Sequence, residues 1–167
     1  MIELLFRAKR MVGGNLWLKD CRGYVEDDEG FWLYHTKKGS YECERIKRET
    51  LGLYVGRVDI HGARIYEGDY LMVVLPNDDG EDEPSETYEI GYVAYDGERG
   101  EFCIKYDGSS MSDELFTQKF IQEYKVEIVG NVFDGYKLKE GLVRIQDSPF
   151  DTYYMKKEVA EDAIRGK

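Results

Sequence analysis

The most apolar segment of the sequence, YLMVVL, covers residues 70–75 and lies between Gly68 and Pro76. An unbroken apolar run with aromatic and β-branched members, bounded by turn-forming residues, is typical of a strand buried on both faces. A helix is the alternative, but Gly68 and Pro76 would confine it to a short one. We therefore expect residues 70–75 to form a strand in the core.

Further strand-like segments lie on both sides of this run. They cover residues 2–8, 16–18, 31–34, 52–58, 65–66, 88–95, 102–106 and 126–133, and turn-forming residues separate them. Residues 37–50 are too mixed in composition to assign. One short helix is expected between Ser112 and Tyr124, because Ser112 can cap it and Phe116 and Phe120 would share a face.

Composition supports a mainly β fold. The chain has 14 Tyr, 7 Phe and 18 Gly but only 3 Pro, and aromatic residues favour strands while glycine serves tight turns. We expect a small barrel-like or sandwich-like domain of antiparallel strands over residues 1–136. Residues 137–167 are expected to be a C-terminal extension, weakly structured or helical, in which Leu138, Leu142, Val143 and Ile145 can form one more strand. The acidic run NDDGEDEPSE after Pro76 is expected to be an exposed hairpin loop.

Charge and cysteine content limit the functional classes. The net charge of −11 disfavours nucleic acid as a direct partner, because phosphate contacts need Lys and Arg. Cys21, Cys43 and Cys103 are widely spaced, which predicts three small core residues in a reducing cytoplasm and no structural zinc. Neither a signal peptide nor a membrane span is visible. We expect a cytoplasmic protein that does not engage membranes.

Two motifs carry a resemblance to a known family. Residues 55–69 read VGRVDIHGARIYEGD, and residues 127–134 read EIVGNVFD. The first resembles the hallmark T-G-L-x-D-x-x-G-x-x-I-Y-E-G-D of the YopX family, with Val55 in place of Thr and Arg57 in place of Leu. The second resembles the closing E-V-I-G-N-I-Y-E of that family. The opening FRA at residues 6–8 also agrees with it.

The resemblance covers roughly residues 1–136. It implies an all-β, barrel-like or sandwich-like fold and an origin in phages or prophages, so that the compartment would be the bacterial host cytoplasm. It implies no catalytic residue, because the family has no established reaction to transfer.

The motifs contain five candidate binding residues, for which a structural role is the stronger interpretation. Asp59 suits a turn in which its carboxylate accepts backbone N–H groups and Gly62 takes the left-handed conformation. The segment EGD at residues 67–69 suits a bulge or kink. The five candidates are Asp59, Tyr66, Glu67, Asp69 and Asn131.

Catalysis and cofactor binding have little support. Glu67 and Asp69 are two residues apart, so on a strand both carboxylates would face one side, at the short end of the separation used by glycosidases. The acidic residues 78–83 lack the spacing of a calcium loop, and no nucleotide-binding motif is present. His35 and His61 have no nucleophile at a recognisable spacing. We expect no catalytic residue, no metal and no cofactor.

Two functional hypotheses from different classes remain besides an uncharacterised carboxylate-dependent enzyme. The first is a protein-interaction module, with an unidentified protein partner or self-association through exposed tyrosines or an open sheet edge. The second is a role linked to nucleic acid, either single-strand binding on a small β barrel or mimicry of DNA by acidic surface.

Overall fold

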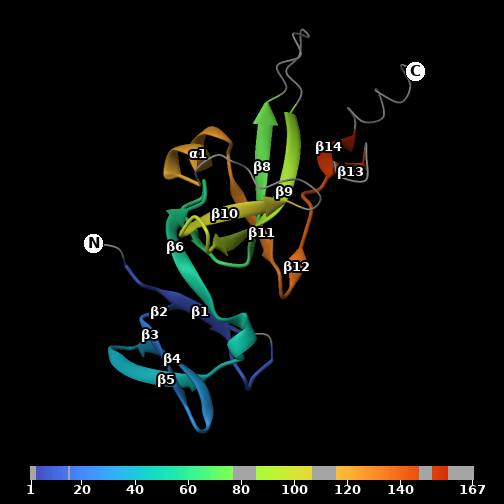
Figure 1. The fold of residues 1–167 in the computed structure, drawn as a ribbon. Helices are drawn as coiled ribbons and strands as arrows, with labels where there is room; N and C mark the ends of the chain where they lie inside the picture. Colours follow the sequence, from blue (N-terminus) through green and yellow to red (C-terminus); the bar gives the residue numbers. More distant parts are fainter. Residues whose placement is uncertain (1–2, 15, 77–85, 107–115, 147–151, 158–167) are drawn as a thin grey trace, which may run out of the picture. The chain divides into compact units, whose positions relative to one another are not determined.

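The computed structural model describes residues 3–14, 16–76, 86–106, 116–146 and 152–157, and these residues form a mainly β protein with curled, barrel-like antiparallel sheets (Figure 1). Their contacts divide the chain into two compact units. Unit 1 comprises Met1–Arg57 and Arg64–Glu67, and unit 2 comprises Val58–Ala63 and Gly68–Lys167. The chain therefore passes between the units three times within the first motif.

Unit 1 contains two antiparallel sheets. The first has the order β2-β1-β6-β7 and the second the order β3-β4-β5. The strands are β1 (Phe6–Lys9), β2 (Trp17–Cys21), β3 (Gly23–Asp27), β4 (Gly30–Lys37), β5 (Ser40–Arg45), β6 (Gly52–Val58) and β7 (Arg64–Tyr66), and a single 3-10 turn, η1 (Arg48–Thr50), precedes β6.

The core of unit 1 lies where the inner face of β4 meets β1 and β2. Ala8, Cys21, Leu33 and Ile46 are fully buried there, and Phe6, Leu18, Phe31 and Leu51 pack around them. Because strand side chains alternate between faces, Phe31 and Leu33 point inward while Trp32 and Tyr34 point to the opposite face. The three-stranded sheet thus has one face on the core and one face outside it.

The hairpin between β4 and β5 is closed by Lys38 and Gly39. Both have positive φ, 50° and 84°, as a two-residue type I′ turn requires. This turn fixes the register, so that Lys37 pairs with Ser40 and His35 with Glu42. Strands β3 and β5 lay outside the predicted segments.

Unit 2 is built on a seven-stranded antiparallel sheet with the order β12-β11-β8-β9-β14-β13, in which β10 also pairs with β9. The strands are β8 (Asp69–Pro76), β9 (Glu86–Asp96), β10 (Glu101–Tyr106), β11 (Glu127–Asn131), β12 (Gly135–Tyr136), β13 (Leu142–Gln146) and β14 (Thr152–Lys156). Two strands, β13 and β14, thus fall within the expected C-terminal extension.

Strand β8 contains the apolar run of residues 70–75. Leu71, Met72, Val73 and Val74 are all buried, so the prediction of a strand covered on both faces is confirmed. It pairs with β9 on one side, where Pro76 lies opposite Glu86, and with β11 on the other. The acidic run predicted as a hairpin loop lies largely outside the described residues.

The single α-helix of the described residues, α1 (Gln118–Glu123), begins later than expected. Thr117 caps it, since its hydroxyl accepts the backbone N–H of Phe120 at 3.1 Å. Ser112, the expected cap, lies outside the described residues. With six residues α1 is far below the length of a bilayer span, and no other described helix qualifies as one.

The cysteine prediction is partly wrong. Cys21 and Cys103 are buried, but Cys43 is exposed, because it alternates with Glu42 and Glu44 on β5 and so lies on the outer face of the three-stranded sheet. All three are free thiols. Residues 158–167, at the end of the expected C-terminal extension, lie outside the described part of the chain.

Candidate functional site

Asp59 organises the turn between β6 and β7. Its side chain is 3 % exposed, and Oδ1 accepts the backbone N–H groups of His61 at 2.9 Å and Ala63 at 2.8 Å. Oδ2 accepts the N–H of Ile128 on β11 at 3.4 Å. Gly62 has φ of 81°, as this tight turn requires. The Asp59 carboxylate therefore ties the turn of the first motif to the strand of the second, within unit 2.

Tyr66 is buried at the end of β7 in unit 1. Its hydroxyl donates to Asp20 Oδ1 at 2.7 Å and accepts the backbone N–H of Asp20 at 3.3 Å. Burial, with the Asp20 contact, raises the pKa of the Tyr66 phenol. Burial also acts to raise the pKa of Asp20, but hydrogen bonds from Tyr66 and Arg64 outweigh it and leave that pKa lowered. Asp20 itself has φ of 59°, in the left-handed region.

A basic and aromatic cluster surrounds the Tyr66 ring. The Arg7 guanidinium lies 5.0 Å from the Tyr66 ring centroid and 4.9 Å from that of Trp17, and Lys9 lies 5.4 Å from Trp17. Arg7 and Lys9 are only 5 % and 6 % exposed. These cation–π contacts stabilise the interior of unit 1 and do not form an open basic groove of the kind that single-stranded nucleic acid needs.

The carboxylate-pair hypothesis assumed that Glu67 and Asp69 lie on one strand, but the structure does not place them on the same strand. Strand β7 ends at Tyr66, and Glu67 and Gly68 form a turn before β8 begins at Asp69. Gly68 has φ of 80°, so the alternation of side chains is broken between the two carboxylates. Glu67 belongs to unit 1 and Asp69 to unit 2.

Asn131 caps the turn that follows β11. Its Oδ1 accepts the N–H groups of Phe133 at 3.0 Å and Asp134 at 3.1 Å, and its amide donates to the Asp134 carboxylate at 3.0 Å. Asp69, which is 1 % exposed, lies opposite Asn131 in the β8–β11 register. The Asp59 carboxylate is thus bonded to backbone N–H groups, and the Asn131 side chain is bonded to backbone N–H groups and to the Asp134 carboxylate.

The structure reveals an exposed aromatic surface that sequence reasoning missed. The register pairs Val25 with Trp32, Tyr34 with Cys43, and Thr36 with Tyr41, which places all six on the outer face of β3–β4–β5. Tyr41 is 76 % exposed, Val25 42 % and Tyr34 39 %. We call Val25, Trp32, Tyr34, Tyr41 and Cys43 the outer aromatic face.

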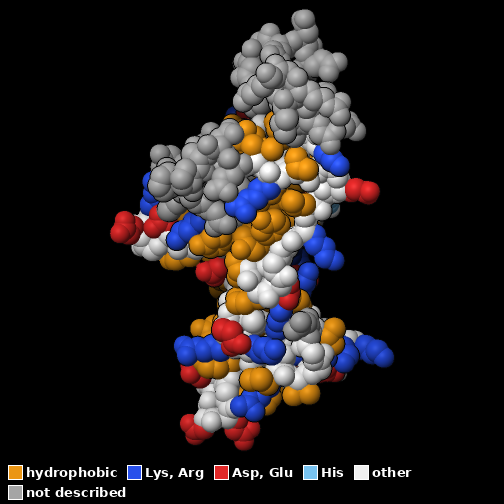
Figure 2. Space-filling view, turned by 90° about the vertical axis from the view of Figure 1, so that its right-hand side faces the viewer, with side chains coloured by type: hydrophobic (Ala, Val, Ile, Leu, Met, Phe, Trp, Pro, Cys, Tyr) orange, Lys and Arg blue, Asp and Glu red, His pale blue; other side chains and the backbone are white. Residues whose placement is uncertain are grey.

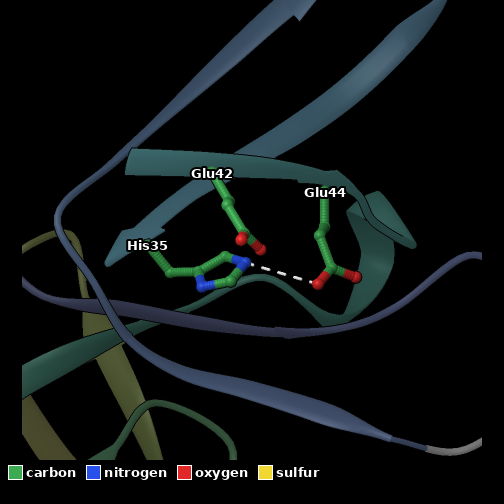
Figure 3. A group of neighbouring side chains, drawn as sticks. All are labelled: His35, Glu42 and Glu44. Carbon is green, nitrogen blue, oxygen red and sulfur yellow. Dashed lines mark ion pairs between the residues drawn. The ribbon is translucent and has the colours of Figure 1, made fainter. Parts of the chain in front are cut away.

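The inner face of the same hairpin carries a polar cluster. His35 on β4 and Glu42 and Glu44 on β5 point toward one another (Figure 3), and His35 Nε2 lies 3.3 Å from Glu44 Oε1. Glu44 also forms an ion pair with Arg10. The sequence feature that could have predicted this pairing is Lys38-Gly39, because a two-residue hairpin loop at this position sets His35 opposite Glu42.

Unit 2 contains a cavity of about 420 Å³ beside β13 and β14. Its lining combines one aromatic ring with three lysines and one glutamate, and consists of Tyr88, Lys139, Glu140, Gly141, Leu142, Lys156 and Lys157. Tyr88 donates to Glu86 at 2.9 Å, and Lys139 forms an ion pair with Glu127. Figure 2 shows hydrophobic side chains gathered on one face of unit 2 with Lys and Arg side chains beside them.

Comparisons with known proteins add little. No protein-family model matches the chain, and no curated protein matches it. Among solved structures, the protein EF1440 from Enterococcus faecalis is similar, with 20 % sequence identity and a TM-score of 0.47, over 79 % of this chain and 94 % of that one. A similarity at this level carries no argument about activity.

Proposed function

We propose that this chain is a YopX-like accessory protein of phage or prophage type, and that it acts as a binding module whose outer aromatic face engages a protein partner. The observation that carries the proposal is the exposure of Tyr34, Tyr41 and Val25 on a sheet face whose opposite side already covers the core. Family membership rests on the two motifs, at residues 55–69 and 127–134.

The chemistry of the outer aromatic face fits a protein partner. Tyrosine and tryptophan offer large, stiff contact areas, and truncating such a residue at an interface often costs more than about 1 kcal/mol of binding free energy. Trp32 is held in place, because its indole N–H donates to Asp27 Oδ1 at 3.0 Å. That hydrogen bond is also the main reason why the pKa of Asp27 is lowered. A pre-arranged ring loses little conformational entropy on binding.

Charged turns border the outer aromatic face and can contribute selectivity. Asp28 and Glu29 are exposed in the turn between β3 and β4, and Lys37 and Lys38 are exposed at the turn between β4 and β5. Apolar rings between an acidic and a basic rim match the usual pattern of a protein interface, in which the centre is dry and the rim polar. The expected partner therefore presents an apolar patch with charges of both signs beside it.

Cys43 makes a direct test possible, because it is the exposed thiol of this face. Burial, with Asp20 and Glu44 nearby, raises the pKa of Cys21 to about 11, and burial raises that of Cys103, so both react slowly. A thiol-directed photocrosslinker on Cys43 should join the protein to one partner from a phage-infected bacterial lysate. Purified partner should then bind the wild type but bind Tyr34→Ser/Tyr41→Ser at least about tenfold more weakly.

Tyr95 supplies the matched control, since it is 51 % exposed on β9 in unit 2. Tyr95→Ser should bind the purified partner like the wild type. Equal binding by the double variant would refute the proposal. A crosslink only to a second copy, with sedimentation showing dimers, would replace it with self-association.

Nucleic-acid binding is the competing proposal, and a carboxylate-dependent enzyme is the third. A salt-dependent mobility shift of single-stranded DNA at low salt would support the nucleic-acid role. The burial of Arg7 and Lys9, described above, weighs against that role in unit 1.

A further inference from the structure

We propose that unit 1 binds a divalent transition-metal ion through His35, Glu42 and Glu44. One nitrogen and two carboxylate oxygens of these residues all lie within 4.8 Å of one another (Figure 3). The site is separate from the outer aromatic face, because it occupies the inner side of the β4–β5 hairpin. The inference therefore goes beyond the proposed function.

The hairpin brings the three side chains together by rigid means. His35 and Glu42 are direct cross-strand partners, and Glu44 is two residues from Glu42 on the same face of β5. Metal–ligand bonds of about 2.0–2.2 Å place the donors around one ion roughly 3–3.5 Å apart. The present spacing needs a contraction of about 1 Å, which glutamate side-chain rotations supply without moving the strands.

The imidazole of His35 is the second observation. Its Nε2 atom is hidden from solvent and makes no hydrogen bond within the described part of the chain, although Glu44 Oε1 lies 3.3 Å away. The lone pair of an imidazole nitrogen lies in the ring plane, in the direction that an N–H bond would take, and a carboxylate oxygen beside it but off that direction is repelled unless a positive charge lies between the two atoms. A proton on Nε2 would not point along the contact with hydrogen-bond geometry, whereas a metal ion would bind both atoms.

The nearby cations leave the donors usable. Arg10 contacts Oε2 of Glu44, which leaves Oε1 on the side of His35. Such an outer partner is common for a ligating carboxylate, because it fixes the orientation of the group. Lys37 lies 3.6 Å from Glu42 Oε2 but is 62 % exposed, so it can turn into water when a metal ion binds.

The donor set selects the class of ion. Imidazole with carboxylates suits zinc, manganese, iron, cobalt, nickel and copper, whereas magnesium and calcium prefer oxygen donors throughout. Three protein ligands also leave room for water or an added group at the remaining positions.

The test uses the full chain, freed of metal with a chelator and kept in excess Mg²⁺ to saturate the many surface carboxylates. Equilibrium dialysis with Zn²⁺ should show one tightly held ion per chain. Co²⁺ should give the visible absorption of a protein-bound ion with a nitrogen ligand. His35→Ala and Glu44→Gln should each weaken Zn²⁺ binding by at least about tenfold.

His61 provides the matched control, because its Nε2 atom also lies beside a glutamate, 3.5 Å from Glu127 Oε2, but is far more exposed. His61→Ala should bind Zn²⁺ like the wild type. Far-UV circular dichroism checks that each variant is folded. Equal Zn²⁺ affinity in His35→Ala and wild type would overturn the proposal. The absence of tight Zn²⁺ binding to the wild type would also overturn it, and the cluster would then be an ion-pair network. Glu42→Gln removes one carboxylate but keeps the shape of the side chain, so that weaker Zn²⁺ binding by this variant cannot be attributed to misfolding.

Discussion

Replacing Asp59 with alanine should destabilise unit 2 more than any other single loss of a turn-capping side chain described above. The carboxylate accepts two short backbone hydrogen bonds, from His61 and Ala63, and a longer one from Ile128. A hydrogen bond to a charged group contributes about 1.5–3 kcal/mol, but the donors of the turn can be rehydrated in the variant. We therefore expect a loss of about 2–4 kcal/mol in the free energy of unfolding.

Three measurements give the size of this loss and the unit in which it falls. With a urea m-value of about 2 kcal/mol/M, a loss of 3 kcal/mol moves the unfolding midpoint by about 1.5 M, which circular dichroism detects. Trp17 and Trp32 both belong to unit 1, so tryptophan fluorescence follows that unit separately. Hydrogen exchange should show faster opening of β11 around Ile128.

Asp96 is the matched control, because it caps the turn between β9 and β10 through bonds to Glu98 at 2.9 Å and Arg99 at 3.4 Å. These donors are exposed, so Asp96→Ala should cost no more than about 1 kcal/mol. If Asp59→Ala and Asp96→Ala shift the midpoint equally, the carboxylate of Asp59 does not hold the two motifs together and the reasoning is refuted.

Two further predictions concern unit 2 and use the same urea titrations. A Cβ atom on Gly130 would lie 2.1 Å from the carbonyl oxygen of Gly135, so Gly130→Ala should lower the free energy of unfolding by about 2–3 kcal/mol or more. Gly97→Ala, with open space at its Cβ position, should lower it little. Equal unfolding midpoints for the two variants would contradict this close approach. Hydrogen bonds from Lys125 and Tyr88 lower the pKa of Glu86 below its ordinary value of 4.5. Ionised Glu86 therefore stabilises the fold above that pH, and the benefit disappears as pH falls through the folded pKa. The stability difference between wild type and Glu86→Gln should therefore shrink toward zero on acidification, and a constant difference would show that Glu86 does not titrate in this way.

Much of the fold could be predicted because several strands carry their own signal. The run at residues 70–75 is apolar without interruption, as burial on both faces requires, and strand β6 coincides with the predicted segment 52–58. Turn residues such as those at 96–100 mark the hairpin between β9 and β10. In each case the local sequence and the final environment agree.

Strand β5 shows why the remainder could not be predicted. Its sequence SYECER places Glu42 and Glu44 on the inner face and leaves Tyr41 and Cys43 outside, the reverse of the usual apolar alternation. The His35 cluster follows from this inversion and from the register of one hairpin. The pairing of His35 with Glu42 has a local signal in the turn Lys38-Gly39. The inward orientation of the glutamates has none, because it depends on which face of the hairpin other strands cover.

The path of the chain through the first motif limits how the protein can be divided. The first segment of unit 2, Val58–Ala63, interrupts unit 1 in the sequence. Unit 1 then continues with Arg64–Glu67 before the rest of unit 2 begins. A fragment ending at Arg57 would lack β7 with its Tyr66–Asp20 bond, and one beginning at Gly68 would lack the Asp59 turn. Neither half is a continuous gene segment, so separate expression would require circular permutation or coexpressed pieces instead of a simple truncation.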